Sequence, residues 1–259
     1  MKLDQGSIGR FWRFYEAPTW LLVAGVYGTW LALTWFYAIL PWWFLLPAGG
    51  YVVALHGSLQ HELLHGHPTR WAWLNALLAR PGLWLWLPYG IYRDSHIAHH
   101  RDALLTTPGI DPESNYVEAA RWQQLGRATR FLHWAMRTSA GRFLLGPALT
   151  IVTVWVDIVR GPRQRGWPAL RTWVEHLALL ALLLWWVQAE AGIAPPHYLF
   201  GIAYPALGLA MMRSFYEHRP VGDFAGQFHH GVARCADHDG HVARFAAAMH
   251  YVEFNTIHV

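Results

Sequence analysis

The chain has 259 residues, of which 54% are hydrophobic and 15% aromatic, while only 14% are charged. Soluble domains carry about 25% charged residues, so this composition argues against an ordinary soluble protein and favours an integral membrane protein. The net charge is +4, and almost all of the positive charge is carried by arginines. These arginines are spread along the polar segments and do not form a basic cluster, so nucleic acid is not an expected partner. Cys235 is the only cysteine, which excludes an intrachain disulfide and a cysteine-based metal knuckle.

The N-terminal part of the chain contains two apolar runs separated by a proline. Residues 17–40 carry no charge after a short polar arm, and about 20 apolar residues suffice to cross the hydrocarbon core of a bilayer. Pro41 ends this run. Residues 42–59 form a second apolar run, which predicts a return crossing that delivers the following histidines to the cytoplasmic side.

The middle of the chain is predicted to contribute no span. Residues 71–91 are apolar but include an arginine and two prolines, so we expect an interfacial or partly inserted segment. Residues 101–142 are polar, and two amphipathic helices are expected after a turn-rich loop. Residues 144–159 are apolar but short, and a crossing there would place the next four arginines outside, against the positive-inside tendency. This run is therefore expected in the interface or buried against the protein.

Two further spans are predicted at about residues 172–191 and 197–215. The expected fold class is an all-α integral membrane protein with four transmembrane helices in two hairpins and a cytoplasmic helical cap. Both outer loops lack arginine and lysine, so both termini and the histidine-rich stretches are expected on the cytoplasmic side, in a bacterial inner membrane.

Seven of the seventeen histidines lie within residues 56–102, in two clusters. In the first cluster, HELLH, His61 and His65 are one helical turn apart and point from one face. The second cluster, HIAHH, contains three histidines that can reach one centre from a helix, namely His96, His99 and His100. Burying so many imidazoles beside apolar sequence is costly unless a partner takes up their nitrogens, so the clusters predict a metal site with nitrogen and oxygen ligands.

The motifs HELLHGH, HIAHH and EHRP, set in order among hydrophobic hairpins, resemble the membrane fatty acid desaturase and hydroxylase superfamily over about residues 15–223. The resemblance implies two irons at the cytoplasmic face of the membrane, with O2 as co-substrate. It implies six histidine ligands, which are His61, His65, His96, His99, His100 and His218. It also implies a lipid or acyl substrate and an electron carrier such as a ferredoxin or a cytochrome b5-like protein.

Several residues next to the histidine motifs are candidates for orienting the ligands. Glu62, Asp94, Asp102 and Asp111 are candidate carboxylates for orienting the imidazoles, with a solvated surface charge as the alternative for each, and Glu62 and Asp102 are favoured. Two other histidines are not expected to bind the metal. His56 is expected to be a hydrogen-bond partner of a ligand or to face the helix interior, and His67, before Pro68, is expected to cap a turn.

The last part of the chain departs from the family pattern. The family's third box has the form N-N-x-H-x-x-H-H, whereas this sequence ends FNTIHV, so that Asn255 and His258 align with the start of the box and its last two histidines are absent. We therefore divide the chain into a desaturase-like membrane domain, 1–223, and an atypical histidine-rich tail, 224–259. Three explanations stay open: substitute ligands from the tail, a truncated or frame-disturbed sequence, which we favour, or a partly filled site that uses Asn255 and His258.

The expected function is O2-dependent oxidation of an unactivated C–H bond in a fatty acyl or lipid substrate, with desaturation as the favoured outcome. A lipid or carotenoid hydroxylase or ketolase on the same scaffold is the nearest alternative, because the box spacing does not determine the product. A membrane metal-binding or transport protein without redox chemistry, or an inactive scaffold that has lost the last box, are the remaining alternatives.

Overall fold

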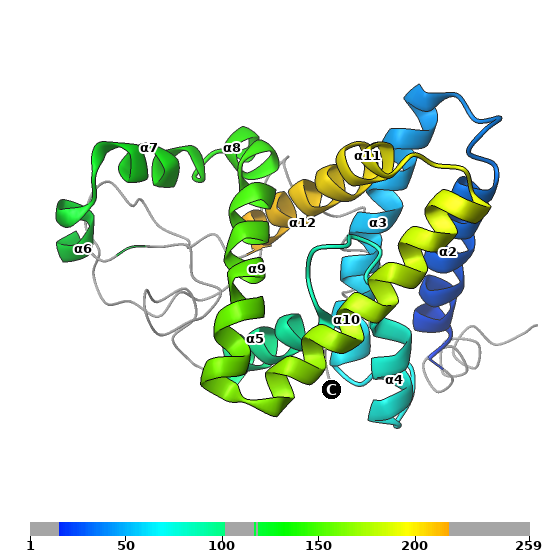
Figure 1. Ribbon diagram of the computed structural model, residues 1–259, viewed down its shortest axis with the longest axis horizontal. Helices are drawn as coiled ribbons and strands as arrows, with labels where there is room; N and C mark the ends of the chain where they lie inside the picture. The colour runs from blue at the N-terminus through cyan, green and yellow to red at the C-terminus, as the bar shows by residue number, and fades with distance from the viewer. Residues whose placement is uncertain (1–15, 102–116, 118, 218–259) are drawn as a thin grey trace, which may run out of the picture.

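The computed structural model describes residues 16–101, 117 and 119–217, and within these ranges every regular element is a helix (Figure 1). This confirms the predicted all-α class. The N-terminal half contains α2 (Ala17–Trp35), α3 (Trp42–Leu64), α4 (Ala72–Ala79) and α5 (Tyr89–Arg101). The C-terminal half contains α6 (Ala119–Gln124), α7 (Arg127–Ala135), α8 (Ser139–Leu144), α9 (Gly146–Arg165), α10 (Trp167–Trp185), α11 (Pro195–Tyr198) and α12 (Tyr204–Glu217).

The first two apolar runs form the hairpin α2–α3, but their helices have different bounds from those predicted. Helix α2 ends at Trp35, and a series of turns leads to Pro41, which precedes α3 in an extended conformation. Helix α3 continues beyond the apolar run, because its polar continuation, including Glu62, is buried against other helices and keeps a helical backbone. Helix α3 packs between α2 and α12, and Gly49 lets Ile202 approach its backbone closely.

The two apolar runs near the C-terminal end are also helical. Helix α10 continues through a π-helical turn to Glu190, and α11 is joined to α12 by a second π-helical turn, Leu199–Ala203. Within the part of the chain that the structure describes, one helix, Trp167–Glu190 with 24 residues, is long and apolar enough to cross a membrane by length and composition. The other three predicted spans are not confirmed by this criterion. In α2, tryptophan, tyrosine, threonine and glycine make up nearly half of the sequence and lower its mean hydropathy.

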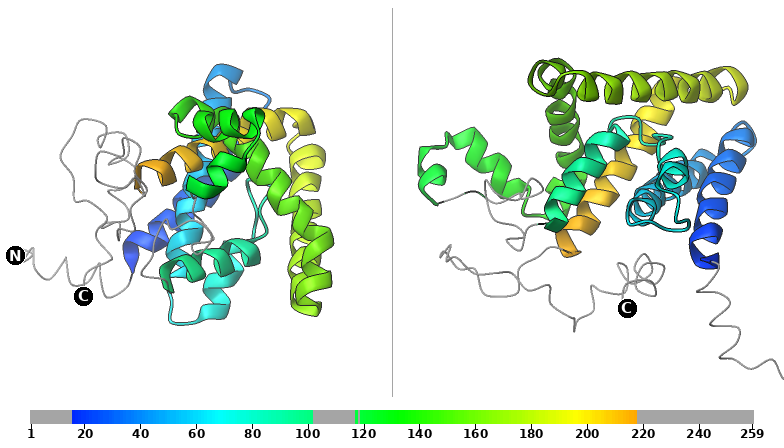
Figure 2. Two further views of the ribbon diagram at one scale, coloured as in Figure 1. Left: turned by 90° about the vertical axis from the view of Figure 1, so that its left-hand side faces the viewer. Right: turned by 90° about the horizontal axis from the view of Figure 1, so that it is seen from below.

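The middle of the chain differs from the prediction in one respect. Where two amphipathic helices were expected within residues 101–142, three short helices, α6 to α8, follow residue 118. Gly126 starts α7 in an extended conformation, and the Thr138 side chain accepts a hydrogen bond from the Gly141 N–H at 2.9 Å to begin α8. Helices α6 and α7 extend away from the other helices (Figures 1 and 2), whereas α9 packs against α8, α10 and α12.

The buried apolar core lies among α2, α3, α10 and α12 and includes the irregular connection from α4 to α5. This connection, residues 80–88, passes between α3 and α10 and leads directly into α5 (Figure 2). It corresponds to the segment predicted not to form a span, and the helices at both of its ends are short. The core therefore joins the hairpin α2–α3 to the helix that carries the second histidine motif.

Candidate metal centre

The first pair of histidines lies at the C-terminal end of α3. His61 is within the last turn of the helix, and His65 follows its last residue, with its N–H still bonded to the His61 carbonyl at 3.2 Å. The two imidazole rings lie 4.5 Å apart between centroids. The prediction that both rings point from one face is confirmed.

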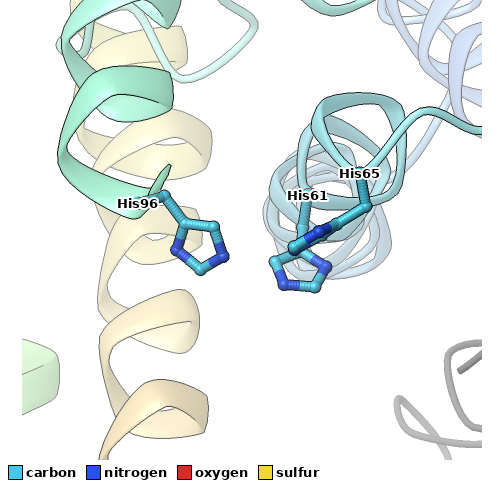
Figure 3. Close-up of side chains that lie close together, drawn as sticks. All are labelled: His61, His65 and His96. Carbon is cyan, nitrogen blue, oxygen red and sulfur yellow. The ribbon is translucent and has the colours of Figure 1, made fainter. Parts of the chain in front are cut away.

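A third histidine faces this pair from a different helix. His96 lies on α5 and is buried, and its ring is 4.8 Å from that of His61 and 5.6 Å from that of His65 between centroids. Figure 3 shows the three side chains turned towards one another across the space between α3 and α5. Residues that are 31 to 35 positions apart in the sequence therefore form one cluster, as the two motifs predicted.

The ligand atoms of His61, His65 and His96 all lie within 4.8 Å of one another. Metal–imidazole bonds are about 2.1 Å long, so two nitrogens on one ion are at most about 4.2 Å apart. Side-chain shifts of less than about 1 Å would bring the three nitrogens onto one ion. The donor set fits iron, zinc or copper, because neutral imidazole offers one lone pair to each of them.

The surroundings of His65 favour its neutral form. Partial desolvation, together with the neighbouring His61 and His96, lowers the pKa of His65 from 6.5 to about 4. At neutral pH this ring is therefore uncharged, and one of its nitrogens carries the lone pair that a metal needs. Burial increases from the exposed His65 through His61 to the buried His96, so the cluster is open to solvent on the His65 side.

Of the two described carboxylates predicted to orient the cluster, Glu62 and Asp94, Glu62 is the one beside a cluster histidine. Its side chain is buried, and its Oε1 lies 3.4 Å from Nδ1 of His61. A carboxylate that accepts from Nδ1–H fixes the tautomer of a histidine and leaves Nε2 for a metal ion. Asp94, in contrast, forms an exposed ion pair with Arg93 at 2.7 Å.

Sequence reasoning missed Tyr92, which stacks on His96 with a centroid separation of 5.5 Å and an interplanar angle of 30°. Its position four residues before His96, one turn earlier on α5, is the signal that could have identified it. The stacked ring of Tyr92 restricts the rotation of the His96 imidazole.

The other predicted site residues lie elsewhere or are not described. His99 and His100 lie on α5, but the structure does not describe their side chains. Five of the predicted residues fall outside the described residues, namely Asp102, Asp111, His218, Asn255 and His258. Of the two histidines not expected to bind the metal, His56 is fully buried and bonds to the Tyr27 hydroxyl at 3.2 Å, and His67 bonds through Nδ1 to Glu16 at 3.0 Å.

The chain is similar to a known protein family. The sequence model of the family "Fatty acid desaturase" matches residues 38–255, which is most of the chain and includes both histidine motifs. The match leaves the incomplete third box untested. Comparison with curated proteins and with solved structures returned no significant match.

Proposed function

This chain belongs to the fatty acid desaturase family, and on that basis we propose that it oxidises an unactivated C–H bond of a fatty acyl or lipid substrate with O2 at a histidine-ligated di-iron centre. The family is membrane-associated and acts on lipids. Desaturation is the outcome we propose for this chain. The observation that carries the proposal is the meeting of His61, His65 and His96 from two helices, with ligand atoms within 4.8 Å of one another.

We assign the ligands as follows. The imidazoles of the three clustered histidines would hold the metal, and His99, His100, His218, His258 and Asn255 are proposed as further ligands. Glu62 would keep Nδ1 of His61 protonated and its ring oriented, and Asp102 would do the same for a ligand of the second motif. When bound, such a centre supplies O2-dependent removal of hydrogen from an unactivated carbon, a step that no amino-acid side chain performs.

The chain itself would provide position and an environment with little water. His96 and Glu62 are buried, and apolar side chains of the core adjoin α3 along most of its length. Such surroundings would hold an acyl chain through apolar contacts and limit the access of water to the reacting carbon. The exposed side of His65 is the direction from which a small reactant would approach.

The proposed arrangement in the membrane has four spans, with the site and both termini in the cytoplasm of a bacterial cell. The apolar helix Trp167–Glu190 supports one of these spans. We propose that a ferredoxin or cytochrome b5-like carrier delivers electrons at the cytoplasmic face. The arginines of α7 and α9 would attract such an acidic carrier.

One observation favours a second candidate function. A cluster of three histidines can also hold a metal ion that takes no part in redox chemistry, so a membrane protein that binds metal without oxidising a substrate is the alternative. A lipid or carotenoid hydroxylase or ketolase remains the alternative among enzymes.

Metal content and lipid analysis test the proposal together. The full chain, purified in detergent, is expected to hold about two irons per chain by elemental analysis, and cells that express it are expected to gain unsaturated acyl chains that a His61→Ala, His65→Ala variant does not produce. Bound zinc, or no metal, would contradict the oxidase. Iron without any lipid product would favour the non-catalytic alternative, and hydroxylated products would favour the hydroxylase.

A further inference from the structure

The connection between α4 and α5 is buried although it is not helical. Within residues 80–88, the exposed fractions of Leu83, Trp84 and Leu85 are 1%, 5% and 3%. Leu85 has a φ of 70°, an unusual conformation for a residue with a branched side chain, which persists only where the surroundings enforce it. Buried irregular backbone has carbonyl groups without a partner in a helix, and each one that stays unsatisfied destabilises the fold.

Five carbonyls between Leu78 and Trp86 are satisfied by side chains, and each donor comes from a different helix. Tyr27 on α2 donates to the carbonyl of Leu78 at 2.5 Å, and Gln60 on α3 donates to that of Ala79 at 2.7 Å. Tyr198 on α11 donates to Leu83 at 2.8 Å, His176 on α10 to Leu85 at 3.0 Å, and Trp155 on α9 to Trp86 at 3.1 Å. We call residues 78–88 the clamped segment. Its position is defined relative to five helices at once.

Two of these donors are themselves held by hydrogen bonds. The Tyr27 hydroxyl gives its proton to the Leu78 carbonyl, so its oxygen accepts from Nε2–H of the buried His56. Similarly, the Tyr198 hydroxyl donates to Leu83 and accepts from the indole N–H of Trp30 at 2.8 Å. These chains explain why His56, a histidine close to the metal-binding motif in sequence, lies outside the cluster.

Steric contacts leave the clamped segment and the start of α5 little freedom. A Cβ added at Gly57 of α3 would lie 2.2 Å from the ring of Trp84, so the indole packs directly on the α3 backbone. A Cβ added at Gly90 of α5 would lie 2.8 Å from Thr172 of α10. The segment thus rests on the helix that carries His61 and His65, and the helix that follows it rests on α10.

We propose that the clamped segment sets the position of α5 and thereby holds His96 against His61 and His65, with His176 as its principal positioning residue. Helix α5 begins at Tyr89, four residues after the carbonyl that His176 bonds. His96 is seven residues further on, about 10 Å along the helix axis, so a tilt of 10° at the start of α5 moves His96 by about 2 Å. That displacement is as long as a metal–nitrogen bond.

His176 suits this role better than the other donors. It is buried on α10, and its Nε2–H donates to Leu85, the residue of the segment with a positive φ, whereas Tyr27 and Gln60 bond the end of α4. Glutamine can place its side-chain N–H near the position of Nε2, whereas leucine keeps the volume and lacks a donor. The two substitutions therefore separate the hydrogen bond from packing.

The inference rests on the proposed function only in taking the three histidines as metal ligands, so its test has one readout with metal and one without. Anaerobic Fe²⁺ binding to the full chain in detergent is measured by competition with a chromogenic chelator. His176→Leu is expected to weaken binding by about 10-fold to 100-fold, the range typical of groups that orient ligands. His176→Gln is expected to bind within about threefold of the unchanged chain. His197→Leu, a matched change that removes a bond to Tyr37, is expected to have no effect.

The metal-free readout is the distance between nitroxide labels at Arg70→Cys and Asp94→Cys, in a Cys235→Ala background. The distance distribution is expected to broaden in His176→Leu and in the smaller Tyr198→Phe change, and to stay narrow in His176→Gln and His197→Leu. Unchanged distributions in both His176→Leu and Tyr198→Phe, or equal broadening in His197→Leu, would overturn the proposal. If the unchanged chain bound no Fe²⁺, the proposed function would fail, and the label distances would still decide whether the segment positions α5.

Discussion

The clamped segment and the arm formed by residues 119–138 are both rich in polar contacts, but the contacts span very different distances in the sequence. The side chains that bond the clamped segment lie 19 to 115 residues from their acceptors. In the arm, Arg130 bonds the carbonyls of Trp122 and Gln123, which are eight and seven residues away. Phe131 and Trp134 of the arm have exposed fractions of 62% and 59%.

The two kinds of contact have different consequences: one stabilises a local element, and the other fixes where an element lies in the molecule. A hydrogen bond between near neighbours in the sequence stabilises a turn or a helix end but leaves the position of that element free. Hydrogen bonds from five helices to one short segment define where that segment lies in the molecule. The helix that carries His96 follows the clamped segment directly, so changes in this segment are expected to affect metal binding more than changes in the arm.

The largest effect is expected from removing the ligand on α5, the helix that follows the clamped segment. His96→Ala should abolish iron retention while the chain still inserts and purifies, because two remaining imidazoles of the described cluster do not hold an ion tightly. Iron per chain, measured by elemental analysis, checks this expectation. His197→Ala, in α11, is the control and should retain iron. Wild-type iron in the His96 variant would refute the ligand assignment.

A strong loss of stability is expected from disturbing the contact between α3 and the clamped segment. Gly57→Ala places a methyl group 2.2 Å from the Trp84 ring, and overpacking of this kind typically costs about 1–3 kcal/mol of unfolding free energy. Thermal unfolding in detergent measures the change. Gly28→Ala on α2 is the matched control, because no atom lies within 4 Å of its added Cβ, and it should gain about 0.4–1 kcal/mol. Equal melting temperatures for both variants would contradict the packing described here.

A smaller effect is expected from the carboxylate beside His61. Glu62→Gln keeps the volume and an acceptor oxygen but removes the charge, and it should weaken Fe²⁺ binding by about 10-fold. Chelator competition measures the affinity. The same substitution at Glu190, an exposed residue at the end of the π-helical turn after α10, is the control and should change the affinity by less than about twofold. An unchanged affinity in Glu62→Gln would remove this residue from the site.

The smallest effect is expected in the arm. Phe131→Ala and Trp134→Ala remove exposed rings that make few contacts with the rest of the chain, so each should change the unfolding free energy by no more than about 0.5 kcal/mol. Both variants should keep the metal affinity of the unchanged chain. A loss of metal in either variant would show that the arm is coupled to the site and would weaken the contrast between the two regions.

Most of the helices and the centre of the site were predictable from the sequence. The spacing of His61 and His65 and the position of His96 in the second motif predicted imidazoles on helix faces, and the structure brings these three together. The bounds of the helices were predicted less accurately. The apolar run 42–59 did not indicate that α3 extends to Leu64, because a buried polar stretch continues a helix without an apolar signal.

The sequence by itself determined the helical class, the family and the residues that can bind a metal, because helix periodicity and imidazole chemistry are properties of short stretches. Only the tertiary structure decided how α5 is held against α3. The carbonyls of Leu78, Ala79, Leu83, Leu85 and Trp86 accept from side chains on five helices. Every residue carries a carbonyl group, so these acceptors have no signature in the sequence, and the side chain that reaches each one is defined by packing between distant helices.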